Sequence, residues 1–153
     1  MKIVKNIINA CLFASALTLS SCALRSIPSD YSTVKLDTVD TNTLGNGKVL
    51  IYNGAGFLHA VDNTARLNIW IDNKSLGQIR PKEYLIIDLA KGKYEFTALH
   101  IDMVNMRSKH QVEINENTKV INIEPTITSN KLTITNVLPK NFENYVYRPE
   151  RSN

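Results

Sequence analysis

Apolar and polar residues alternate through most of the chain beyond Gly47, and this period of two restricts the fold more than any other feature. Side chains of an extended strand point alternately to opposite faces of a sheet, so such alternation predicts strands with one buried face. Residues 66–72 are an example, with Leu67, Ile69 and Ile71 on one face and Asn68, Trp70 and Asp72 on the other. Helical periodicity is missing from the same stretch of sequence. We therefore expect an all-β domain.

Short polar segments separate the alternating runs. The segment "DNKS" supplies turn residues after residue 71, and Asn73 tolerates the positive φ that a tight hairpin requires. Residues 83–89 and 93–101 are expected to meet as a second hairpin across residues 90–92, where Gly92 provides the turn.

Later runs continue the same pattern. Residues 110–114 and 119–125 flank the turn signal "NENT", and a last run follows Ser129 and Asn130. About seven or eight short strands at regular spacing are typical of a β-sandwich. We expect one Ig-like or prealbumin-like β-sandwich at residues 48–138, followed by a C-terminal tail at residues 139–153.

The first residues have the features of a secretory signal peptide. Lys2 and Lys5 form a positive start, and residues 7–19 form an apolar run that is too short to span a bilayer comfortably. Small residues then lead into Cys22. Residues 1–21 are therefore expected to be an export signal that is removed.

The four residues Leu19, Ser20, Ser21 and Cys22 resemble the lipobox of bacterial lipoproteins. In that family a diacylglyceryl group is attached to the cysteine thiol, the signal is cut just before it, and a fatty acid such as palmitate acylates the new amine. The resemblance implies that Cys22 is the lipidated first residue of the mature protein. Several acyl chains make membrane attachment durable, whereas one chain holds a protein reversibly. The alternative is a plain signal peptide with an accidental cysteine.

The remaining cysteine, Cys11, lies inside the signal, so neither a disulfide framework nor a free thiol is expected in the mature chain. Ala23 and Leu24 follow Cys22. By the same resemblance, the absence of an aspartate directly after the cysteine favours the outer membrane, with the domain facing the periplasm or the cell surface.

Residues 22–47 are rich in Ser, Thr, Asp and Asn and contain few large apolar side chains. This composition predicts a flexible tether between the lipid and the domain. The weak alternation of "STVKL", residues 32–36, leaves an irregular lead-in strand as the alternative.

The charge distribution does not fit nucleic-acid binding. The formal net charge of +4 falls to about +2 with the signal, because Lys2 and Lys5 are its only charged residues. Basic residues of the remaining chain are scattered among acidic ones, whereas a nucleic-acid footprint is clustered. The length of the chain without the signal suits a single domain.

The stretch "LNIWIDNKSLGQIRPKEYLIIDLAKGKYEFTA", residues 67–98, is similar to the repeating unit of PEGA-type domains and to a related family of small bacterial lipoproteins without known function. Asn73 replaces the turn glycine of that unit, and the Pro-Glu-Gly-Ala element is absent. The resemblance implies a sandwich fold and offers no catalytic residues to carry over. The matching positions are Ile71, Asp72, Lys74, Leu76, Gly77, Leu89, Gly92, Lys93 and Tyr94.

Titratable residues form no recognised catalytic or metal-binding motif. His59, His100 and His110 stand far apart, and the sequence contains neither HExxH nor a GxSxG nucleophile elbow. His100 and Asp102 would project to the same side of an extended strand, but the end of a structural strand is the favoured interpretation. We expect no cofactor, no metal and no catalysis.

Three groups of residues are candidate interaction sites. Met103 and Met106 are expected in a loop, where flexible side chains adapt to a partner or plug the end of the sandwich. Tyr145 and Tyr147 belong to an aromatic and basic tail of interface-like composition, which suits a closing strand or docked terminal segment equally well. Trp70 suggests a stacking platform for a sugar, or a half-buried sandwich residue.

The resulting functional hypothesis is a lipid-anchored envelope lipoprotein whose sandwich is structural or binds another envelope protein. The alternative is a periplasmic inhibitor or a small-ligand or glycan-binding module with a cleft near Trp70 or the methionine loop. A third hypothesis, an enzyme acting on peptidoglycan or glycan, requires titratable residues that converge in a pocket. The sequence does not indicate an oligomeric state.

Overall fold

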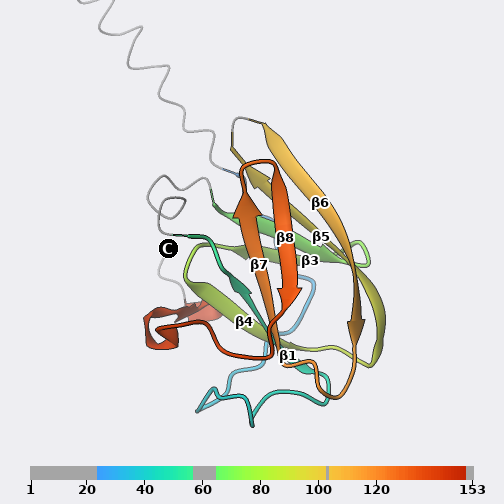
Figure 1. Ribbon diagram of the computed structural model, residues 1–153, viewed down its shortest axis with the longest axis vertical. Coiled ribbons are helices and arrows are strands. Elements are labelled where there is room, and N and C mark those ends of the chain that lie inside the picture. The colour runs from blue at the N-terminus through green and yellow to red at the C-terminus, as the bar shows by residue number, and fades with distance from the viewer. Residues whose placement is uncertain (1–23, 57–64, 103, 151–153) are drawn as a thin grey trace, which may run out of the picture.

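The computed structural model describes residues 24–56, 65–102 and 104–150, which form a two-layered β-sandwich (Figure 1). This confirms the predicted all-β fold. The described residues contain nine strands and two short 3₁₀ helices: β1 (Lys48–Asn53), β2 (Leu67–Ile71), β3 (Lys74–Ile79), β4 (Glu83–Asp88), β5 (Gly92–Ile101), β6 (Asn105–Ile114), β7 (Val120–Thr126), β8 (Ser129–Ile134), η1 (Phe142–Asn144), β9 (Val146–Tyr147) and η2 (Arg148–Glu150).

The strands divide into a mixed sheet and an antiparallel sheet. Sheet A has the order β8-β7-β1-β4-β9, and sheet B has the order β3-β2-β5-β6. Within sheet A, β1 runs antiparallel to β4 but parallel to β7, and β9 runs parallel to β4. The chain therefore changes sheet between β1 and β2, β3 and β4, β4 and β5, and β6 and β7.

The first predicted hairpin forms between β2 and β3. Asp72 and Asn73 occupy its turn with φ values of 48° and 67°. Two consecutive residues with positive φ are what a type I′ hairpin turn requires, and Asn and Asp tolerate this conformation better than most residues. The expectation for Asn73 is confirmed.

The second predicted hairpin is wrong, because β4 and β5 belong to different sheets. β4 pairs with β1 and β9, whereas β5 pairs with β2 and β6. Residues 90–92 therefore cross between the layers. A polar connection containing a glycine serves such a crossover as readily as a hairpin turn. The "NENT" segment after β6 is likewise a crossover, since β7 lies in sheet A.

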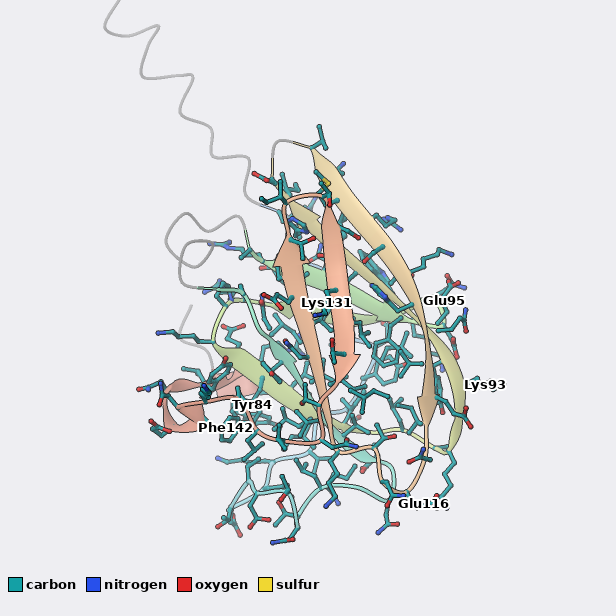
Figure 2. All side chains as sticks on the ribbon, in the orientation of Figure 1. Tyr84, Lys93, Glu95, Glu116, Lys131 and Phe142 are labelled. Atoms are coloured by element: carbon teal, nitrogen blue, oxygen red, sulfur yellow. The ribbon has the colours of Figure 1, made fainter. Side chains whose placement is uncertain are left out.

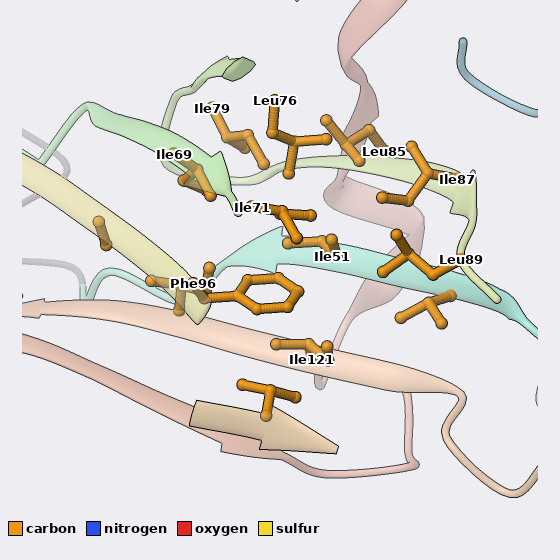
Figure 3. Packing of buried hydrophobic residues seen from close by; sticks show 14 of the residues in the cluster. Ile51, Ile69, Ile71, Leu76, Ile79, Leu85, Ile87, Leu89, Phe96 and Ile121 are labelled. Atoms are coloured by element: carbon orange, nitrogen blue, oxygen red, sulfur yellow. The ribbon is translucent and has the colours of Figure 1, made fainter. Parts of the chain in front are cut away.

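The main core fills the space between the sheets, as Figure 3 shows. Leu67, Ile69 and Ile71 are fully buried there, which confirms their predicted common face. Phe96 of β5 packs among isoleucines that include Ile121 of β7. Full burial of side chains of this size stabilises a fold by about 1.5–3 kcal/mol each.

A second apolar cluster covers the outer face of sheet A. Leu50, Ile86 and Val120 are buried on this face, although they point away from the main core. Because β1 and β4 are covered on both faces, they appear in the sequence as nearly continuous apolar runs rather than alternating ones. The covering side chains come from both ends of the chain: Val34, Leu36, Val39, Leu138, Phe142 and Tyr145.

Residues 24–44, which we call the strap, lie along the side of the sandwich formed by β3 and β4. The Asp30 amide donates to the Ser75 carbonyl of β3 at 2.7 Å, and the Ser75 amide donates to Asp30 Oδ2 at 2.8 Å. The Val34 amide then donates to the Ile86 carbonyl of β4 at 2.8 Å. The flexible tether predicted for residues 22–47 is therefore not what the described part of this segment forms. It is irregular in conformation but docked.

The C-terminal tail also docks on the sandwich. β9 pairs with β4 through Glu83–Val146 and Tyr84–Tyr147, so it extends sheet A. The Phe142 ring lies 4.8 Å from the Tyr84 ring, centroid to centroid. Figure 2 labels both side chains, which lie next to each other there. Of the two alternatives left open for the tail, the structure supports a docked segment with a short closing strand.

Candidate interaction surfaces

His100 lies inside the sandwich rather than at a ligand site. Its Nδ1 is 2.7 Å from Oδ1 of Asn130, and both residues are buried. His110 lies on β6 and contacts the Ser108 hydroxyl at 3.0 Å, while His59 falls outside the described residues. Within residues 24–56, 65–102 and 104–150, no three His, Cys, Asp or Glu side chains come together as a metal site.

Trp70 is half-buried on the outer face of sheet B. It pairs with Thr97 of β5, and Thr97 pairs with Lys109 of β6, so the three side chains form one row. The Arg107 guanidinium lies 5.2 Å from the centre of the indole ring, within the range of a cation–π contact. With Asn73, these residues line a shallow concavity of about 270 Å³.

One acidic side chain contacts this row. Lys109 Nζ lies 2.8 Å from Glu95 Oε1, with the two side chains 60% and 31% exposed. An ion pair with this much exposure contributes little to stability because water and salt screen it. The pair nevertheless lowers the local excess of positive charge contributed by Arg107 and Lys109.

The strap begins on this same outer face. Gln78 Nε2 of β3 donates to the Leu24 carbonyl at 3.0 Å, and Asn68 Nδ2 of β2 donates to the Arg25 carbonyl at 2.8 Å. Gln78 also donates to Asn68 Oδ1 at 3.1 Å. Two buried amide side chains therefore hold the backbone two and three residues after Cys22.

Sequence reasoning assigned no role to Asn68 or Gln78. The available signal was the presence of amide side chains at outward strand positions. Such groups require partners when they are buried. Nothing in the local pattern, however, indicates that the partner is a backbone more than forty residues earlier in the chain.

The end of the sandwich formed by the β5–β6 and β7–β8 connections, which we call the loop end, exposes apolar side chains. Val104 is 60% exposed and Ile127 is 72% exposed. Both connections lie at the top of Figure 1, and Ile127 borders a concavity of about 540 Å³ that Gly56 and Pro125 also line. Met106 lies in β6 rather than in the predicted loop, and Met103 falls outside the described residues.

The tail tyrosines are used within the chain. Tyr145 meets the Tyr52 ring edge-on at 5.6 Å between centroids, and Tyr147 is buried at 5.6 Å from the Tyr84 ring. Partial burial, by removing water from the phenolate, raises the pKa values of Tyr52 and Tyr145. These contacts stabilise the cover over sheet A.

Comparisons with known proteins identified no relative: no family model, no curated protein and no solved structure matches the chain. Among the described residues, no helix has the length and apolarity needed to cross a bilayer.

Proposed function

We propose that this chain is a lipid-anchored protein of a bacterial envelope, attached through Cys22, and that its sandwich acts by contacting another envelope protein. The anchor is supported by the lipobox resemblance at residues 19–22 and the signal-like leader before it. The observation that carries most weight is the position of Leu24. Gln78 holds its carbonyl on the sandwich surface, so the fold begins two residues after the cysteine that would carry the lipid.

The loop end is the proposed protein contact. Val104 and Ile127 are exposed there, on connections that adjoin β6 and β8. Asn130 of β8 bonds these two strands to each other, since its Nδ2 donates to the Met106 carbonyl of β6 at 3.0 Å. Apolar side chains on rigidly supported loops are the kind of surface that partners bury. The open concavity beside Ile127 gives a partner side chain a place to lie.

The anchor is tested by replacing Cys22 with Ser in the full chain. The natural product should incorporate labelled fatty acid, show the mass of a protein acylated at Cys22, and sediment with membranes. The C22S variant should lose all three properties. A variant that remains lipidated and membrane-bound would refute the anchor.

The protein contact is tested separately by placing a photo-reactive residue at Ile127 in cells. We expect crosslinks to one envelope protein. The matched control is the same residue at Thr133, an exposed position on β8 of sheet A. If the two positions give the same products, or if neither gives any, the loop end is not the contact.

A further inference from the structure

We propose that the outer face of sheet B rests on an anionic phospholipid surface, with Trp70 at the lipid interface and Arg107 and Lys109 on the headgroup phosphates. The inference depends on the proposed acylation of Cys22. It adds a second membrane contact, made by the folded domain, and therefore an orientation of the domain that an acyl anchor alone does not specify.

An anchor on Cys22 would hold the domain at short range. Cys22 and Leu24 are two residues apart, so their Cα atoms lie at most about 8 Å from each other. Leu24 and Arg25 are held on this face by Gln78 and Asn68. Acyl chains on Cys22 therefore start beside the outer face of sheet B, and no long coil lets the domain move away from the bilayer.

The described residues leave much of the outer face of sheet B open. The outer face of sheet A is covered by the strap and the tail through the cluster around Leu50, Ile86 and Val120. On sheet B the strap covers Asn68 and Gln78, but Trp70 and Leu99 remain partly exposed. Leu99 lies between Asn68 and Arg107 in the strand register, directly beside the point where the strap begins.

The exposed side chains of this face suit the boundary between lipid and water. Tryptophan combines an apolar ring with a polar N–H, and it is enriched at the boundary between lipid and water. Arg107 and Lys109 combine long apolar stems with charged heads, which can reach phosphates while the stems lie against the lipid. Leu99 and Ile101 add half-buried apolar surface at outward positions of β5.

Charge favours an anionic surface as the occupant. Arg25 and Arg107 are exposed at the end of the face where the strap begins, and Lys109 is exposed two residues farther along β6. Glu95 pairs with Lys109, and the exposed Asp72 accepts from the Glu95 amide, so basic residues outnumber acidic ones here by three to two. The acidic Glu113 lies farther along β6, opposite Lys93. A basic residue close to an anionic bilayer is attracted to it over roughly a Debye length, so the contact is expected to weaken as salt is added.

The experiment uses Trp70 as its own probe, because it is the only tryptophan in the chain. The acylated product of the full chain is reconstituted into vesicles of phosphatidylglycerol and phosphatidylethanolamine whose acyl chains carry bromine. Contact with lipid should quench Trp70 fluorescence and shift its emission to the blue. Vesicles of phosphatidylcholine alone should produce a smaller effect.

The double variant Arg107→Glu and Lys109→Glu reverses the charge of the face but retains the probe. In this variant, the ratio of domains whose sheet B face lies on the lipid to domains whose face is turned away from it should fall roughly 30-fold or more. Most of the quenching should then be lost. The matched control is Lys131→Glu with Lys140→Glu. Lys131 lies on β8 of sheet A, away from Glu95 and the proposed face (Figure 2), and this control should be quenched like the natural protein.

The outcomes separate the two proposals. A chain recovered without acyl groups would overturn both the anchor and this inference. An acylated, vesicle-bound chain whose Trp70 is not quenched, or is quenched equally in the charge-reversed variant, would overturn the membrane-contact face and leave the anchor intact. If Trp70 fluorescence responds to soluble anionic glycan fragments and not to lipid, the face is a glycan-binding site and not a membrane contact.

Discussion

His100 of β5 and Asn130 of β8 join the two sheets through a buried hydrogen bond of 2.7 Å between Nδ1 and Oδ1. The amide nitrogen of Asn130 donates to the carbonyls of Ala98 at 3.2 Å and Met106 at 3.0 Å. The amide oxygen therefore faces the imidazole and must accept, which assigns Nδ1 of His100 as the donor of this hydrogen bond. One side chain thus satisfies three groups on sheet B.

Replacing Asn130 with Ala should destabilise the protein by about 3 kcal/mol, because two carbonyls and an imidazole N–H lose their partner in a buried place. Urea unfolding measures the change. Asn117→Ala, at an exposed turn position, is the control and should stay within about 0.5 kcal/mol of the natural protein. A loss of less than about 1 kcal/mol for Asn130→Ala would mean that water replaces the amide.

Gly77 should not tolerate a side chain. Its φ is +101°, at an irregularity in the pairing of β2 with β3, and a Cβ there would overlap the Arg148 guanidinium. We expect Gly77→Ala to cost about 2 kcal/mol of unfolding free energy. Gly56→Ala is the control, since none of the described residues beyond its chain neighbours places an atom within 4 Å of its Cβ position, and it should cause no loss. Equal effects at both positions would contradict the steric argument.

The strap should exchange its amide hydrogens slowly at Asp30 and Val34, whose N–H groups are bonded to Ser75 and Ile86. Asp30→Ala removes the carboxylate that receives the Ser75 amide, at a cost of about 1 kcal/mol, so exchange at Val34 should accelerate roughly fivefold. Asp37→Ala, an exposed residue of the same strap, should leave the rate unchanged. If the Asp30 and Val34 amides of the natural protein exchange as fast as those of an unstructured chain, the strap is not docked and this segment is a flexible tether.

Alkaline pH should loosen the tail. Burial raises the pKa of Tyr145 above the ordinary phenol value of 10.0, so the folded state retains the phenol proton more strongly than the unfolded state. This stabilising contribution is complete below about pH 10 and is lost as the pH rises through the folded pKa. When the pH is raised from below to above the folded pKa of Tyr145, the urea midpoint of unfolding should therefore fall less in Tyr145→Phe than in the natural protein. An equal fall in both would exclude Tyr145 as a source.

The hairpin at Asn73 was predictable because its determinants are local. Two residues with a tolerance for positive φ lie between runs of period two, and both features are visible within a dozen residues. The same kind of local pattern led to a wrong prediction at residues 90–92, which cross between the sheets instead of forming a hairpin turn. The partners of β4 are β1, more than thirty residues before it, and β9, about sixty residues after it. No local pattern distinguishes a turn that returns to the same sheet from one that crosses to the other.

The candidate site residues were predictable in kind but not in arrangement. Trp70 was placed on the outward face of its strand from alternation alone, and it lies there. Its neighbours Arg107 and Lys109 come from β6, and only the pairing of β5 with β6 places them beside the ring. Met106 was misplaced because β6 begins at Asn105, earlier than its mixed polar sequence suggested.

The sequence by itself determined the strand periodicity, the inward face of β2 and the type of its turn, because these depend on side chains within a few residues of one another. Only the tertiary structure decided which sheet each strand joins, that the strap and the tail cover sheet A, and that Asn68 and Gln78 hold the backbone at Leu24 and Arg25. The physical reason is that backbone groups and apolar faces of this kind are satisfied by partners distant in the chain, and many such pairings are chemically equivalent until the whole sandwich closes.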